Sequence, residues 1–73
     1  MNNIRIAELV IQYRKVNRIS QSDFGKLFGV SAQAVSKWEG ERAYPDITVL
    51  PDLAMVLNCS VNDFFVNKKS QVF

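Results

Sequence analysis

The chain has 73 residues, of which 48% are hydrophobic, and it contains one cysteine and no histidine. This length suits one small domain, near the size at which a single core is only just sufficient. The single Cys59 excludes an internal disulfide, and the lack of histidine excludes an acid–base pair or a zinc site built on imidazole. No apolar run is long enough to span a bilayer, and the opening residues, M-N-N-I-R-I, lack the apolar region of a secretory signal. We therefore expect a cytoplasmic protein that needs no cofactor and contacts no membrane.

The net charge of +2 is too small to identify a binding partner, but the charge is unevenly distributed along the chain. Residues 1–45 contain seven Lys or Arg and four Asp or Glu, a net charge of +3. Residues 46–73 contain two Lys and three Asp, a net charge of −1. The positive charge therefore lies with the helical pair described below.

The first helix is predicted over residues 4–16. Apolar side chains recur there at helical spacing, at Ile6, Leu9, Val10, Tyr13 and Val16. Asn2 or Asn3 can cap its start. Basic side chains lie toward its end, where cations suit the negative end of the helix dipole. These are Arg14, Lys15 and Arg18.

Two further helices are predicted over residues 21–28 and 32–39, joined by a short turn. Ser20 can cap the first of them by accepting a backbone N–H bond. Gly29 supplies the left-handed residue that ends this helix, and Ser31 caps the next one. Two helices joined by about three residues that include a glycine form the helix-turn-helix unit, which is typical of DNA-binding proteins.

The helix over residues 32–39 has one polar and one apolar face. Because each residue advances by about 100°, Lys37 lies within about 40° of Gln33. Val35 and Trp38 lie on the opposite side and are expected in the core. Outward residues in the N-terminal half of such a helix reach base edges in a DNA groove. We therefore predict four base-contacting residues, Ala32, Gln33, Ser36 and Lys37.

The second half of the chain carries the remaining predicted helices. Pro51 is tolerated in the first turn of a helix, so we expect a helical turn over residues 46–50 followed by a regular segment over residues 51–58. The apolar positions of this region are Ile47, Leu50, Leu53, Ala54 and Leu57. Ser60 and Asp63 form a capping-box pattern that opens a short fifth helix. Its apolar residues are Val61, Phe64 and Phe65.

These elements predict an all-α fold, a compact five-helix bundle in which the second and third helices form the helix-turn-helix. Residues 1–66 are predicted to be a helix-turn-helix DNA-binding domain. Residues 67–73 are predicted to be a C-terminal tail, because they show no periodicity.

In element order and spacing, residues 6–65 resemble the Xre/Cro-like family of bacterial and phage helix-turn-helix regulators. The most specific matches are Arg14, Ser20-Gln21, Gly29-Val30-Ser31, Ser36-Lys37-Trp38-Glu39 and Pro45-Asp46-Ile47. The resemblance implies a fold of the phage-repressor-like DNA-binding type. It also implies an ion pair between Arg14 and Glu39, in which the guanidinium holds the carboxylate by two parallel bonds.

Three positions depart from the family pattern. The family usually has Ala at Gly25, and Gly in a helix interior costs about 1 kcal/mol relative to Ala, so this helix is expected to be weaker. The third helix is expected to end at Gly40, and Glu41 adds an acidic group beside the phosphate-facing loop. Cys59 stands where a small aliphatic residue is usual, and we expect it to pack as a small hydrophobe.

The predicted DNA contacts follow from the hydrogen-bonding groups of the side chains. The Gln33 amide can both donate and accept, which matches adenine N6 and N7, and Ala32 can rest on a thymine methyl. Lys37 can reach guanine O6 and N7 or a phosphate. Gln21, with the backbone N–H groups at the start of its helix, is expected to hold a phosphate, and the resemblance implies the same role. The loop after the third helix supplies two further candidates for a phosphate clamp, Arg42 and Tyr44.

We therefore predict a sequence-specific regulator of transcription, most simply a repressor, which acts by occupying its site. Its partner would be a double-stranded DNA operator, palindromic if the chain forms a homodimer, with half-sites about 34 Å apart. The apolar end of the chain could supply the dimer contact or close the core. That end comprises Val61, Phe64, Phe65, Val72 and Phe73.

A second hypothesis is an antitoxin-like or adaptor domain whose main partner is another protein. The modest net charge and the acidic Glu41 keep this alternative open. An enzymatic function has little support, because the chain has no glycine-rich phosphate loop and no nucleophile motif, and no small-molecule substrate is evident.

Overall fold

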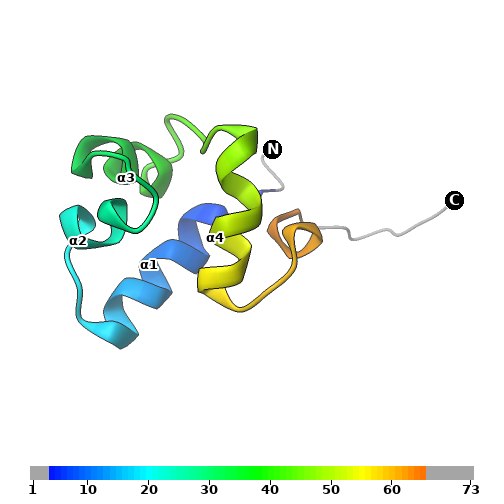
Figure 1. The fold of residues 1–73 in the computed structure, drawn as a ribbon, viewed down its shortest axis with the longest axis horizontal. Helices are drawn as coiled ribbons and strands as arrows, with labels where there is room; N and C mark the ends of the chain where they lie inside the picture. The colour runs from blue at the N-terminus through cyan, green and yellow to red at the C-terminus, as the bar shows by residue number, and fades with distance from the viewer. Residues whose placement is uncertain (1–3, 66–73) are drawn as a thin grey trace, which may run out of the picture.

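The computed structural model describes residues 4–65, which form four α-helices and two short 3₁₀ helices (Figure 1). The α-helices are α1 (Ile6–Asn17), α2 (Gln21–Lys26), α3 (Ala32–Glu39) and α4 (Leu50–Leu57). The 3₁₀ helices are η1 (Ile47–Val49) and η2 (Val61–Phe64). The predicted all-α fold is confirmed. None of the described helices is long and apolar enough to cross a membrane.

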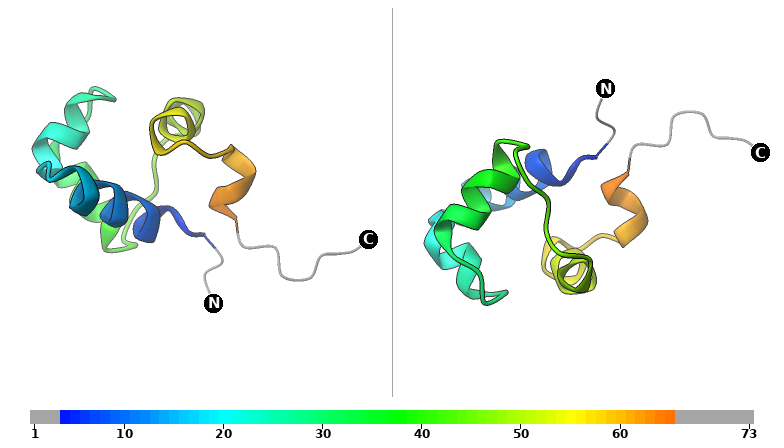
Figure 2. Two further views of the ribbon diagram at one scale, coloured as in Figure 1. Left: turned by 90° about the horizontal axis from the view of Figure 1, so that it is seen from below. Right: turned by 90° about the horizontal axis from the view of Figure 1, so that it is seen from above.

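The core takes one fully buried side chain from every element except η1. These residues are Val10, Phe24, Val35, Leu53 and Phe64. In both views of Figure 2, α2 and α3 lie together at one end of the molecule and η2 lies at the other. Every element therefore depends on its neighbours for burial, as expected for a chain of this length.

A chain of tilted aromatic rings joins the first three helices. The ring centroid of Phe24 lies 5.6 Å from that of Tyr13 and 5.1 Å from that of Phe28. Phe28 in turn lies 6.4 Å from Trp38, which is only 4% exposed. Tilted pairs at these spacings are favourable beyond the area that they bury. Trp38 and Tyr13 therefore serve packing, as their helical positions predicted.

The first helix begins two residues later than predicted. Ile4 forms an isolated antiparallel bridge with Phe65, and the backbone N–H of Arg5 donates to the Phe64 carbonyl at 2.7 Å. These bonds hold Ile4 in an extended conformation, so α1 starts at Ile6. The predicted caps Asn2 and Asn3 lie outside the described residues, as does the predicted tail.

The predicted fifth α-helix is instead the 3₁₀ helix η2, so the described residues contain four α-helices rather than five. Its capping box is formed, with the Ser60 N–H donating to Asp63 Oδ2 at 2.9 Å. Phe65 is already extended, at φ −111° and ψ 124°, because it pairs with Ile4. The segment between cap and bridge is therefore too short for an α-helix. Phe64 is fully buried and closes the core, which removes it from any dimer contact.

Ile47 was predicted to be an apolar position of the fourth helix, but it is 75% exposed. It lies in η1, where the tighter 3₁₀ turn breaks the register that carries Leu53 and Ala54 into the core. Met55, on the outer side of α4, is 77% exposed. The α4 surface therefore carries large apolar groups that the helical pattern alone does not predict.

The turn between α2 and α3 is built around two glycines. Gly29 has φ +70°, the left-handed conformation predicted for it, although α2 ends at Lys26, two residues earlier than predicted. The Val30 N–H donates to the Gly25 carbonyl at 3.0 Å and closes the turn. A Cβ atom at Gly25 would lie 2.5 Å from the Val30 carbonyl oxygen. Gly25 is therefore required by the close approach of the turn, and not merely a weak helix former.

We expect Gly25→Ala to lower the free energy of unfolding by about 1–3 kcal/mol, because overpacking against backbone outweighs a helix-propensity gain of about 1 kcal/mol. Urea unfolding followed by circular dichroism measures this. Gly40→Ala is the control, because a Cβ there would approach no atom closer than 3.4 Å. A Gly25→Ala variant as stable as the unmodified chain would show that the turn yields at little cost.

Candidate nucleic-acid interface

The polar face of α3 points away from the protein. Ser31 caps this helix, accepting the Ala34 N–H at 3.1 Å, and the helix spans the predicted residues. Gln33 and Lys37 are exposed, whereas Val35 and Trp38 are buried. The side predicted to face DNA is therefore accessible.

The other two predicted base-contacting residues, Ala32 and Ser36, are half-buried. They lie at the margin of the exposed face rather than at its centre. Gln33 and Lys37 thus dominate what α3 presents to a partner, and the shorter side chains at 32 and 36 border them.

The chain leaves α3 through a left-handed residue, but that residue is Glu41 and not Gly40. Glu41 has φ +59°, whereas Gly40 has φ −90°. The Arg42 N–H donates to the Lys37 carbonyl at 2.9 Å and the Glu41 N–H to the Trp38 carbonyl at 3.2 Å. This pair of bonds forms a Schellman motif, which usually places Gly at the left-handed position. The motif folds the loop back against the end of α3.

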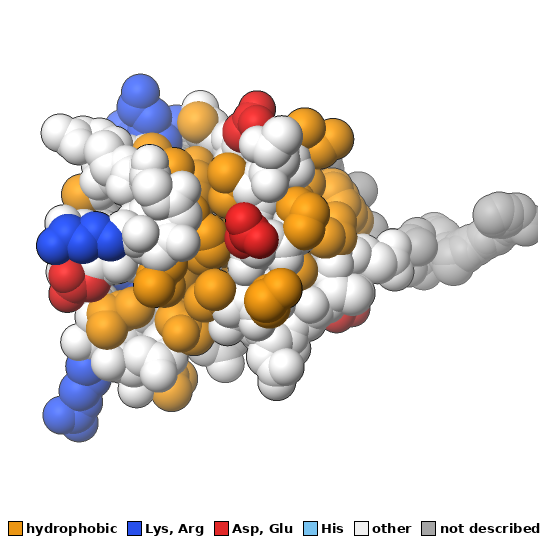
Figure 3. Space-filling view, in the orientation of Figure 1, with side chains coloured by type: hydrophobic (Ala, Val, Ile, Leu, Met, Phe, Trp, Pro, Cys, Tyr) orange, Lys and Arg blue, Asp and Glu red, His pale blue; other side chains and the backbone are white. Residues whose placement is uncertain are grey.

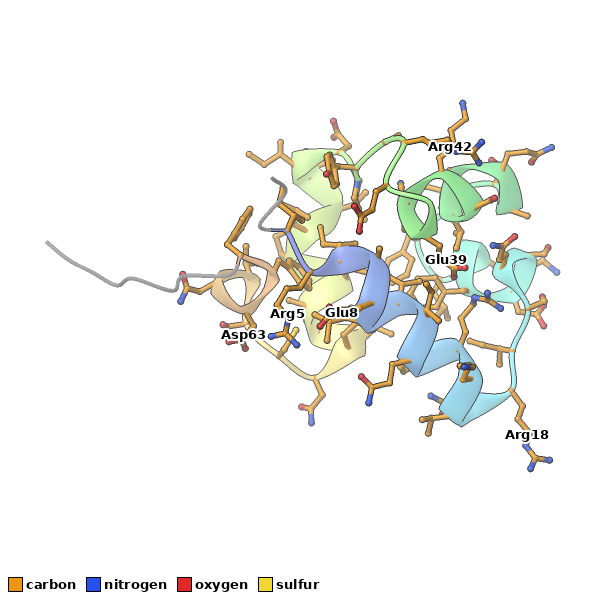
Figure 4. The ribbon with its side chains drawn as sticks, turned by 180° about the vertical axis from the view of Figure 1, so that it is seen from behind. Arg5, Glu8, Arg18, Glu39, Arg42 and Asp63 are labelled. Atoms are coloured by element: carbon orange, nitrogen blue, oxygen red, sulfur yellow. The ribbon has the colours of Figure 1, made fainter. Side chains whose placement is uncertain are left out.

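Two predicted phosphate-clamp residues, Arg42 and Tyr44, lie on this loop and are exposed. Figure 4 shows Arg42 on the outside of the end of α3, whereas Glu39 points inward toward α1. Pro45 is buried and anchors the loop one residue after Tyr44. The loop therefore holds Arg42 at the end of α3 and leaves Tyr44 exposed.

Beneath α3, Arg14 and Glu39 form the ion pair that the family resemblance implied. Arg14 Nε donates to Glu39 Oε2 at 2.6 Å and Nη2 to Oε1 at 2.9 Å. The third guanidinium nitrogen, Nη1, donates to the Ile19 carbonyl at 3.1 Å. The two side chains are 22% and 10% exposed. One guanidinium therefore connects α1, the α1–α2 connection and the last residue of α3.

Gln21 joins the same group, which we call the Glu39 network and define as Arg14, Ile19, Gln21 and Glu39. Gln21 Nε2 donates to Glu39 Oε1 at 3.0 Å. Sequence reasoning placed Gln21 at a phosphate and missed this bond, because the two residues are 18 positions apart and on different helices. Glu39 therefore accepts bonds from both α1 and α2.

The network shifts the titration of its charged members. Hydrogen bonding to Arg14 lowers the pKa of Glu39, which outweighs the opposing effect of burial, and Gln21 lowers it further. The hydrogen bond to Glu39 raises the pKa of Arg14. Both groups therefore remain charged at neutral pH.

Charge is unevenly placed on the surface. In the view of Figure 3, Lys and Arg side chains gather over α2, α3 and the end of α1, with an acidic group among them, whereas α4 carries carboxylates and apolar side chains. Within residues 4–65, no three His, Cys, Asp or Glu side chains are arranged to hold a metal ion. An open hollow of about 260 Å³ between α1 and α4 is lined by Leu9, Gln12, Tyr13, Val16, Asn17 and Leu57.

Because the folded pKa of Glu39 is depressed, its contribution to stability is present above its ordinary value of 4.5 and is lost as the pH falls through the folded value. We expect Glu39→Gln to lower the free energy of unfolding by about 1–3 kcal/mol near pH 7. The difference from the unmodified chain should shrink near pH 3. Urea unfolding at the two pH values measures this.

Glu8→Gln is the matched control, because the Arg5–Glu8 pair is exposed, at 41% and 64%. Its loss should be no more than about 0.5 kcal/mol. Equal losses for both variants, or a Glu39→Gln loss that does not change with pH, would contradict the coupling that we describe.

Comparison with known proteins identifies the family. The helix-turn-helix family model matches residues 10–64. The P22 c2 repressor protein, solved in complex with synthetic operator 9T, is 33% identical, with a TM-score of 0.73 over 82% of this chain and 91% of that one. The solution structure of the P22 c2 repressor DNA-binding domain is also 33% identical, with a TM-score of 0.72 over 100% of this chain and 96% of that one.

A third solved structure shares the fold alone. It is hydroxypropylphosphonic acid epoxidase from S. wedmorenis, in complex with fosfomycin, which is 23% identical with a TM-score of 0.68 over 100% of this chain and 39% of that one. No curated protein sequence gives a significant match. The family model covers most of the chain and agrees with the geometry of α2, the turn and α3. The chain therefore belongs to the helix-turn-helix family.

Proposed function

We propose that this protein is a sequence-specific DNA-binding regulator of transcription, and in the simplest case a repressor, which reads the major groove with α3. The observation that carries this proposal is the exposed polar face of α3. The opposite, apolar face of the helix is buried in the core, and Glu39, its last residue, is hydrogen-bonded to Arg14. The P22 c2 repressor, which shares this fold and is 33% identical, was solved in complex with a synthetic operator. The protein would act by occupying its site, without a reaction of its own.

Base recognition would rest on the side chains that α3 presents. The Gln33 amide suits adenine, because its oxygen can accept from N6 while its nitrogen donates to N7. Lys37 suits guanine O6 and N7 or a nearby phosphate. Ala32 and Ser36, at the margin, suit a thymine methyl and a base edge.

Backbone recognition would come from residues that flank α3. Gln21 lies at the start of α2, and Arg42 and Tyr44 lie on the loop that the Schellman motif folds back. Contacts of this kind position a protein on the duplex and carry no sequence information directly. We propose these three residues as the phosphate contacts.

We further propose a homodimer on a palindromic operator, with half-sites about 34 Å apart. The DNA-binding domain would comprise residues 1–66 and the C-terminal tail residues 67–73. The expected cellular location is the cytoplasm, where the operator of such a regulator would lie.

The alternative of an adaptor or antitoxin-like domain has one observation in its favour. Ile47 and Met55 are 75% and 77% exposed on the outer side of η1 and α4. Large exposed apolar side chains can mark a protein contact where they form one patch. Steep loss of duplex affinity with rising salt, and a large ratio of specific to random binding, would favour the DNA-binding function.

The proposal is tested by selecting sites from random duplexes and then measuring the affinity of variants by fluorescence anisotropy. Gln33→Ala should cost about 1–3 kcal/mol on the selected site and little on random DNA. Arg42→Ala should weaken both duplexes by similar factors, because it removes a phosphate contact.

Gln12→Ala is the control, because it makes the same chemical change on the exposed side of α1. It should leave both affinities unchanged. A failure to select any duplex, or a Gln33→Ala loss that is equal on selected and random DNA, would refute the reading role of α3.

A further inference from the structure

We propose that Glu39 is a positioning residue for phosphate recognition: it holds the Gln21 amide so that one N–H of Nε2 is bonded within the protein and the other is presented to DNA. This inference rests on the proposed function. It adds to the structural role of the Arg14–Glu39 pair a second role, exerted through Gln21.

The first step concerns which end of the Gln21 amide faces Glu39. An ionised carboxylate can only accept hydrogen bonds, and the amide offers two donors on nitrogen and an acceptor on oxygen. The 3.0 Å contact therefore runs from Nε2 to Oε1 of Glu39. The opposite orientation would bring two acceptors together.

The second step concerns what remains available on that amide. A phosphate oxygen, like a carboxylate, can only accept. One amide nitrogen carries two N–H groups, so a single Nε2 can bond Glu39 and a phosphate at once. Gln21 is half-buried, which leaves part of its side chain accessible. With Glu39 in place, the amide presents its second N–H to the phosphate. Because the side chain is already oriented, binding costs no further loss of its conformational entropy.

The third step concerns charge. An unpaired carboxylate beside a phosphate would repel it. Arg14 offsets the charge of Glu39 through two hydrogen bonds, and the Glu39 side chain is only 10% exposed. Glu39 can therefore hold Gln21 without presenting a net negative charge to DNA. Figure 4 shows Glu39 facing α1 and not the outer surface where Arg42 lies.

A double-mutant cycle separates positioning from structural support. The variants are Gln21→Ala, Glu39→Met and the two combined, each tested on the selected duplex at a temperature where circular dichroism shows it folded. Methionine at position 39 keeps a similar side-chain length but has no oxygen that could accept the bond from Gln21. We expect Gln21→Ala to lower affinity about 3- to 10-fold in the unmodified chain, as for one hydrogen bond. In the Glu39→Met background the same change should cost less than about 2-fold.

Arg14→Lys is the matched background. It loses the two-bond geometry and destabilises the fold, yet leaves the Glu39 carboxylate to hold Gln21. Gln21→Ala should keep its about 3- to 10-fold effect there. An equal effect of Gln21→Ala in the unmodified and Glu39→Met backgrounds would overturn the positioning role. If the unmodified chain bound no duplex at all, the proposed function itself would be wrong.

If Glu39→Met does not fold, the unmodified chain still provides a test. The side-chain amide signals of Gln21, assigned by their loss in the Gln21→Ala spectrum, are followed by NMR as the selected duplex is added. We expect these signals to shift together with the onset of binding. Signals that stay unchanged at saturation would overturn the proposal.

Discussion

The orientation of α3 depends on one carboxylate, that of Glu39. Burial of Val35 and Trp38 attracts the helix to the core, but apolar contact has no direction and leaves the helix free to rotate or slide by small amounts. Hydrogen bonds to Glu39 are directional, and they come from α1 and from α2. Because Glu39 is the last residue of α3, the bonds restrain the end of the helix opposite its Ser31 cap. The exposed face is thereby held at both ends.

The distance between α2 and α3 has a separate cause. The Gly25 backbone lies against the Val30 carbonyl with no space for a Cβ atom, and Gly29 turns the chain at positive φ. The tilted rings of Phe24, Phe28 and Trp38 pack against one another between these helices. Backbone approach thus limits the spacing of the two helices, and the Glu39 network ties the end of α3 to α1 and to the start of α2. Neither feature alone would define the position of the residues that α3 presents.

Much of this arrangement follows from local sequence chemistry. The Ser31 cap, the bounds of α3 and the exposure of Gln33 and Lys37 depend on residues within two turns of one another, so helical periodicity predicts them. The family resemblance implied the bond between Arg14 and Glu39, which periodicity could not. The bond to Gln21 was missed because nothing local links the two positions. The 3₁₀ form of η2 was missed for a similar reason, since it depends on pairing with Ile4 at the other end of the described chain. Glu41 took the left-handed position expected near Gly40 because the loop closes on the Lys37 carbonyl.

The structure separates the residues that we propose contact DNA bases from the residues that hold α3 in place. Within residues 4–65 the side chains of Gln33 and Lys37 take part in no hydrogen bond or ion pair, and both are exposed, so the fold does not constrain their identity. Substitutions there can change what α3 recognises at little cost in stability. Glu39 is the opposite case, because its carboxylate serves two helices and, through Gln21, a surface that would face DNA. A change at Glu39 must therefore alter stability and binding together. Sequence preference can thus vary among chains of this fold at the exposed positions, whereas a change in the bonds that hold the helix lowers the stability of the fold that presents it.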